Sequence, residues 1–330
     1  MLIQATDIYE IDLTEECCKK GDKSIIGSDT LVIDGEMLLY AIISAGMPDV
    51  YLTYPERTRR SDEILFKISL FETYVKKIHI KANRYKLAFD FDKKQYLDST
   101  EVGFINYWIG MILTTALGQV KYDYEYLVHL KKLDSFSKNI ELKKRKYKRK
   151  GGGTVYKSPD LIAINVSDDK YGVFESKGYT SYDLDAMSKA YDQAKSIKKI
   201  NKKKTKNRLA VMTVTGKSEI KMFEKDPKDG EIELEVDTSL LDFYHYTPIV
   251  QLVNELEPAD NDKVMTAKLG NGENEITINI AKPLYTSLLP YLSISKQSDA
   301  NKFLDENLER IAGCMKELRG NKKTKIVSVK

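Results

Sequence analysis

The stretch that most constrains the fold of this chain runs from Ser158 to Gly178, where two apolar segments surround a polar turn. Residues 161–166 and 171–174 are rich in branched and aromatic side chains, which favour β-strands, and the Ser-Asp-Asp-Lys sequence between them is typical of a turn. The pattern predicts a β-hairpin. If the turn closes tightly, Val166 pairs with Tyr171, and Asp160 then lies directly opposite Lys177.

Three charged side chains are expected on one face of this hairpin. Glu175 and Lys177 are two residues apart, so the alternation of a strand places both on the same side. In the predicted register Asp160 is a diagonal neighbour of Glu175, with Cα atoms roughly 7–8 Å apart. Two carboxylates at that separation can share one metal ion, because magnesium–oxygen bonds are about 2 Å long. The backbone carbonyl of Ser176 is a candidate third ligand.

The simplest alternative is an ordinary surface hairpin, in which Glu175 and Lys177 are solvated charges. Apolar residues surround the charges on both predicted strands, and a proline stands just before Asp160, at the start of a strand where proline is tolerated. A segment with helical spacing follows directly. These features favour a functional cluster at the edge of a buried sheet.

Pro159-Asp160, followed after a hairpin-length gap by Glu175-Ser176-Lys177, resembles the signature of the PD-(D/E)xK nuclease superfamily. The order of the flanking elements extends the likeness to the span from Asp98 to Thr215. The resemblance implies an α/β protein with a restriction-endonuclease-like core, a mixed β-sheet flanked by helices. It also implies a metal-dependent endonuclease that cuts DNA with Mg²⁺ or Mn²⁺ and uses Asp160, Glu175 and Lys177 as catalytic residues.

Two further residues are candidates through the same resemblance. The first helix of the superfamily often carries a glutamate that reaches the metal, and Glu101 is the matching residue. It lies in the sequence Asp98-Ser-Thr-Glu101, which is also typical of a capping box, so both interpretations stand. The helix that follows has an apolar stripe of Phe104, Ile105, Trp108, Ile109, Ile112, Leu113 and Ala116. Gln193, on the predicted helix 181–199, corresponds to a glutamine found near the site in some branches of the superfamily.

Two basic segments flank the hairpin. Residues 143–150 contain seven lysines and arginines, residues 195–206 contain seven lysines, and neither segment has an acid, in a chain whose net charge is +4. A solvated surface is the plain interpretation of one such segment, but two beside a candidate metal site predict phosphate contacts. The predicted nucleic-acid-binding residues are Lys143, Lys144, Arg145, Lys146, Lys148, Arg149, Lys150, Lys202, Lys203 and Lys204.

Composition sets the broad class. Three cysteines in 330 residues do not form a disulfide framework, and three scattered histidines lack zinc-site spacing. We found no signal peptide and no apolar stretch long enough to span a bilayer, so we expect a cytoplasmic protein without a membrane partner.

We divide the chain into an N-terminal α+β extension at 1–97, a nuclease core at 98–225 and a C-terminal α+β extension at 226–330.

Other functions remain open at this level. A non-catalytic nucleic-acid-binding or scaffold subunit with the same fold, a DNA-repair nuclease and an RNA nuclease are the alternatives. Superfamily members with unfamiliar flanking regions often act as effector nucleases in restriction or anti-phage defence, held inactive until a partner protein or invading DNA acts on them. A regulating partner protein or homo-oligomer would fit that setting.

Overall fold

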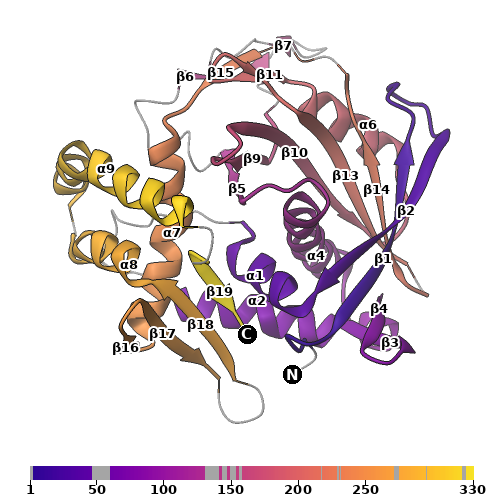
Figure 1. Ribbon diagram of the computed structural model, residues 1–330. Coiled ribbons are helices and arrows are strands. Elements are labelled where there is room, and N and C mark those ends of the chain that lie inside the picture. The colour runs from indigo at the N-terminus through magenta and orange to yellow at the C-terminus, as the bar shows by residue number, and fades with distance from the viewer. Residues whose placement is uncertain are drawn as a thin grey trace.

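The protein is described here by a computed structural model, which covers residues 3–46, 60–130, 141–142, 147–148, 154–155, 158–216, 218–228, 230, 232–270, 275–294, 296–321 and 325–330. The chain is mixed α/β, as expected from the sequence, with a large curled sheet flanked by helices (Figure 1). In the described part of the chain this sheet has nine strands, in the order β3-β4-β1-β14-β13-β10-β9-β5, with β2 also paired to β1. Its strands are β1 (Ile8–Glu16), β2 (Ile25–Asp34), β3 (Val75–Lys81), β4 (Arg84–Phe89), β5 (Tyr126–His129), β9 (Leu161–Asn165), β10 (Lys170–Tyr179), β13 (Asn207–Thr215) and β14 (Ile220–Lys225).

The sheet is assembled from distant parts of the sequence. The N-terminal strand β1 runs parallel to β14 through pairs such as Leu13–Met222, and β10 runs parallel to β13 through pairs such as Glu175–Ala210. Strand β14 lies in the interior of the sheet, because β1 pairs with the side of β14 that faces away from β13.

The helices cover both faces of the central strands. Helix α4 (Ser99–Val120) packs against β10 and β13 inside the curl of the sheet, and α6 (Leu184–Ala194) packs against the same strands from outside (Figure 1). In the apolar stripe of α4, Ile105, Ile109, Ile112, Leu113 and Ala116 are buried, Trp108 is partly buried and Phe104 is half exposed. The predicted helix 181–199 is shorter than expected, because Ile197–Ile200 forms strand β11, which pairs with β15 (Ile232–Glu235).

The C-terminal region packs beside this sheet. It contains α7 (Thr238–Glu255), α8 (Lys282–Leu288), α9 (Gln297–Gly320) and a small sheet of β16 (Ala259–Asn261), β17 (Val264–Leu269), β18 (Ile276–Ala281) and β19 (Val327–Val329). Arg319 on α9 fixes it to the rest of the protein. The Arg319 guanidinium contacts Asp242 on α7 over 2.7 Å and Glu125, just before β5, over 2.8 Å. The remaining strands are β6 (Glu141–Leu142), β7 (Tyr147–Lys148), β8 (Thr154–Val155) and β12 (Lys203–Lys204), and the remaining helices are α1 (Gly35–Ser44), α2 (Arg60–Tyr74) and α3 (Phe91–Lys94).

Candidate active site at the opening of the β9–β10 hairpin

The predicted hairpin is present, but its register differs from the expected one by two residues. The turn is Val166–Asp169, and the pairs are Asn165–Lys170 and Ile164–Tyr171 rather than Val166–Tyr171. The Asn165 side chain favours this earlier turn, because its Oδ1 accepts the backbone N–H of Asp168 over 3.0 Å. A shift of two residues leaves every side chain on its predicted face and changes only its partner.

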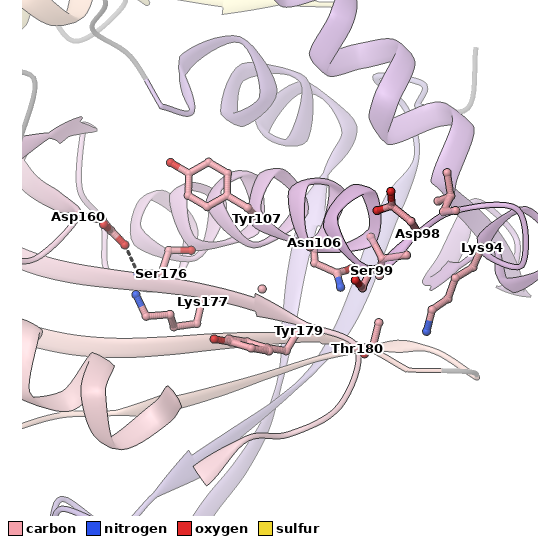
Figure 2. Close-up of a pocket in the computed structure, with 14 residues that line it drawn as sticks. Lys94, Asp98, Ser99, Asn106, Tyr107, Asp160, Ser176, Lys177, Tyr179 and Thr180 are labelled. Atoms are coloured by element: carbon pink, nitrogen blue, oxygen red, sulfur yellow. Dashed lines mark hydrogen bonds between the residues drawn. The ribbon is translucent and has the colours of Figure 1, made fainter. Parts of the chain in front are cut away.

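Asp160 and Glu175 come together where the two strands separate. Pairing ends at Leu161–Phe174, so Asp160 lies beside Glu175 and not, as we had expected, opposite Lys177. The backbone N–H of Asp160 donates to Glu175 Oε2 over 2.8 Å. The backbone N–H of Ser176 donates to Asp160 Oδ2 over 3.2 Å (Figure 2). Each carboxylate is therefore held by the backbone of the other strand.

Lys177 completes the cluster. Its ammonium group donates to Glu175 Oε1 from the same face of β10, as the strand alternation predicted. Glu175 is fully buried, whereas the Lys177 side chain keeps 22% of its surface exposed. The three predicted catalytic residues thus lie within one hydrogen-bonded cluster that is open to solvent on the side of Lys177 and Asp160.

Burial and charge crowding control the protonation of this cluster. Burial, and secondly the charge of Asp160, raise the pKa of Glu175 to about 8. Burial alone would lower the pKa of Lys177, but the charges of Glu175 and Asp160 outweigh it and raise that pKa. The raised pKa favours the protonated ammonium form of Lys177 in this arrangement.

A cleft of about 660 Å³ opens beside these residues. One wall is the first half of α4, including Asn106 and Tyr107, and the other is the end of β10 from Ser176 onward. Asp160 and Lys177 line one end of the cleft (Figure 2). Glu175 is fully buried and is not part of the cleft lining. The end of β10 extends beyond its pairing with β9, so a strand edge borders the cleft.

Tyr107 is a site residue that the sequence analysis missed. Figure 2 shows its ring over the end of the cleft that holds Asp160. Partial burial of its hydroxyl beside the cleft raises the pKa of Tyr107 to about 12, with further contributions from the charges of Asp160 and Glu175. The available signal was an aromatic side chain that falls outside the apolar stripe of a buried helix.

Glu101 and Gln193 lie elsewhere. The Glu101 side chain accepts the backbone N–H of Asp98 over 2.9 Å and so forms the capping box of α4. It lines a different pocket, beside Phe104, and does not join Asp160.

Gln193 donates from Nε2 to the backbone carbonyl of Ser158 over 3.2 Å, which ties α6 to the segment just before Asp160. Gln193 can thus support the position of this segment.

The basic segments are only partly described. Lys143, Lys144, Arg145, Lys146, Arg149 and Lys150 lie outside the described residues, and of Lys148 only the backbone, in β7, is described. Lys202, Lys203 and Lys204 are exposed, and Lys203 forms an ion pair with Asp169 in the hairpin turn. The turn lies at the opposite end of the hairpin from Asp160. Lys170 is five residues from Glu175, which corresponds to about 17 Å along a strand.

The cluster has ligands suited to a hard divalent cation. Asp160 and Glu175 supply two carboxylates, and burial together with their mutual repulsion raises the pKa of Glu175, a cost that a bound cation would relieve. The Ser176 carbonyl belongs to the stretch of β10 beyond the last pair with β9. No group of three or more His, Cys, Asp or Glu arranged to hold a metal ion occurs in the described part of the chain, so such a cation would take its other ligands from the backbone, water or substrate.

A scan against protein-family models and searches of curated proteins and of solved structures found no match to this chain. Among the helices of the described residues, none has the length and apolar character needed to cross a membrane.

Proposed function

We propose that this chain is a Mg²⁺-dependent endonuclease that cuts DNA and that its core is of the restriction-endonuclease-like type. One observation carries the proposal: Asp160, Glu175 and Lys177 come from two adjacent strands and meet in one hydrogen-bonded cluster at the end of an open cleft. The order of the chemical groups, two carboxylates followed by a lysine, is that of the superfamily signature found in the sequence.

Asp160 and Glu175 would hold the metal. When bound, Mg²⁺ lowers the pKa of a coordinated water and neutralises negative charge at a phosphate. The backbone N–H groups of Ser176 and Asp160 orient the two carboxylates before any ligand arrives. Lys177 borders the cleft as a protonated ammonium, and there it would hold the attacking water in place or stabilise the charge that develops on the phosphate.

A second candidate function has one observation in its favour. Both oxygens of Glu175 already have partners in the protein, Lys177 on Oε1 and the Asp160 backbone on Oε2. The same contacts would serve a purely structural ion pair in a non-catalytic nucleic-acid-binding or scaffold subunit. If the chain is a nuclease, the Lys177 ammonium group must move away from Glu175 Oε1 when the metal binds.

The two functions are separated by a plasmid-nicking assay. We expect the purified parent protein to nick negatively supercoiled DNA, in which base pairs open transiently, with Mg²⁺ or Mn²⁺ and to be inactive with EDTA. Lys177→Ala should abolish nicking while circular dichroism shows an intact fold. Lys189→Ala removes an exposed lysine on α6, outside the cleft, and serves as the matched control. Nicking by Lys177→Ala at the parent rate would contradict the proposal, and a parallel assay with RNA decides between the two polymers.

The wider setting of this activity is also a proposal. The resemblance suggests an effector nuclease of restriction or anti-phage defence, regulated by a partner protein or by self-association. Identification of proteins that co-purify with the chain tests this setting separately from the chemistry.

A further inference from the structure

Two exposed tyrosines border the cleft beside the candidate site. Tyr107 projects from α4 and is 40% exposed, and Tyr179, at the end of β10, is 37% exposed. In Figure 2 both hydroxyl groups point toward the end of the cleft that holds Asp160 and Lys177. Large aromatic side chains that stay this exposed in the wall of a cleft offer flat surfaces to a ligand.

The backbones that carry these rings are joined through one residue. The hydroxyl oxygen of Thr215 lies 2.7 Å from Asn106 Oδ1 and 3.3 Å from the carbonyl oxygen of Tyr179. Asn106 immediately precedes Tyr107 and is buried. Both rings therefore extend from a rigid helix and a rigid strand that are fixed relative to each other, so little conformational entropy would be lost when a ligand packs on them.

The charges along the cleft suit a thin anionic chain better than a broad phosphate surface. Lys177 lines one end of the cleft together with Asp160, and Lys94 lines the other end together with Asp98. Two lysines at opposite ends of the cleft can each contact a phosphate of the same strand. The carboxylates would repel the many phosphates of a duplex laid over the same surface.

We propose that this cleft binds an unpaired polynucleotide strand, with bases stacked on Tyr107 and Tyr179 and a phosphate beside Lys177. Bases in a duplex have their faces covered by neighbouring base pairs, whereas unpaired bases stack readily on aromatic side chains. The cleft volume of about 660 Å³ is that of a site for a small molecule or a few nucleotides, not for a double helix. The inference rests on the proposed nuclease function and specifies the substrate class of the same site.

The test is a binding measurement on the full chain in EDTA, where cleavage does not occur. Fluorescence anisotropy would be recorded with labelled 20-nucleotide oligo(dT), oligo(U) and a blunt 20-base-pair duplex. We expect a single strand, deoxy or ribo, to bind more tightly than the duplex. Tyr107→Leu and Tyr179→Leu should each weaken that binding about tenfold, the order expected for loss of one stacked base. Tyr107→Phe and Tyr179→Phe keep the rings and should bind like the parent.

Tyr96→Leu is the matched control, because Tyr96 is 83% exposed, lies next in sequence to residues that line the cleft and does not line it. Tighter binding of the duplex, or equal loss in Tyr96→Leu and in the two cleft variants, would overturn the inference. Tyrosine-dependent binding of single strands by a protein that never cuts would contradict only the nuclease. Cutting of single strands at the parent rate by both Leu variants would contradict only the assignment of the tyrosines.

Discussion

Gly178 on β10 lies directly against the backbone of Asn106 on α4, so that a β-carbon at Gly178 would sit 1.8 Å from the Asn106 carbonyl oxygen. A second contact lies deeper in the same interface, where the Thr114 hydroxyl donates to the Ser176 hydroxyl over 3.0 Å. The helix and the strand that form the two walls of the cleft thus touch through backbone and small side chains.

Gly178→Ala is expected to destabilise the protein, because the new methyl group meets backbone that cannot move aside without shifting α4. Overpacking of this kind costs about 1–3 kcal/mol. Urea unfolding followed by circular dichroism measures the change in the free energy of unfolding. Gly313→Ala on α9 is the matched control: its β-carbon would meet nothing within 4 Å, so it should stabilise the protein slightly. Equal stability of the two variants would show that α4 and β10 are not in tight contact.

The sequence was informative about the site because strand alternation is a local property. It placed Glu175 and Lys177 on one face correctly. That assignment was unaffected by the register error, because a shift of two residues does not move a side chain to the other face. The register itself depends on which turn forms, and the Asn165 side chain decides this through a contact with Asp168 that the apolar pattern does not reveal. The sequence therefore predicted poorly which residues pair across the two strands, and it predicted well on which face of the sheet each side chain lies.

Elements fixed by distant partners were the least predictable. Residues 197–200 continue the helical spacing of α6, yet they form β11 because β15, more than thirty residues later, supplies the other edge. In the same way β14 is an interior strand only because β1 from the N-terminus pairs with it. Glu101 was ambiguous because one glutamate fits both a capping box and a metal site, and its contact with Asp98 is the one observed.

The raised pKa of Glu175 predicts a specific dependence of stability on pH. In the unfolded chain this carboxyl loses its proton near pH 4.5, whereas in the folded protein it keeps the proton to about pH 8. The folded state binds the extra proton, so its stability should fall as the pH rises through that window. In EDTA, the urea midpoint of the parent should decrease more between pH 5 and pH 8 than that of Glu175→Gln.

Glu309→Gln, which alters an exposed glutamate on α9, should keep the pH dependence of the parent. If Glu175→Gln and the parent lose stability in parallel across this range, the buried carboxyl is not the group responsible.

A second pH effect is expected at His245 on α7, where the sign is opposite. Its ring stacks on Tyr126 with centroids 4.3 Å apart, and its Nε2 lies 2.8 Å from the Tyr40 hydroxyl. Burial, together with the positive charge of Arg319, lowers the pKa of His245 to about 3. Folding therefore requires the neutral ring, and stability should be lost as the pH falls below about 6.5.

His245→Phe keeps a ring on Tyr126 and removes the titrating group. Its urea midpoint should consequently decrease less between pH 6.5 and pH 4.5 than that of the parent. His79→Gln changes an exposed histidine on β3 and should behave like the parent. An unchanged acid response in His245→Phe would show that His245 is not the group responsible.

Metal binding should appear as stabilisation even where no cleavage is measured. A cation held by Asp160 and Glu175 binds the folded state and not the unfolded one, so its binding adds about 2.7 kcal/mol at a concentration one hundred times its Kd. We expect Mg²⁺ or Mn²⁺ to raise the melting temperature of the parent at pH 8, and EDTA to reverse the shift. Asp160→Asn removes one ligand charge and should abolish the shift, whereas Asp305→Asn, an exposed change on α9, should leave it intact. An equal shift in Asp160→Asn and the parent would place the cation elsewhere, since Asp160 is the carboxylate through which the cluster opens into the cleft.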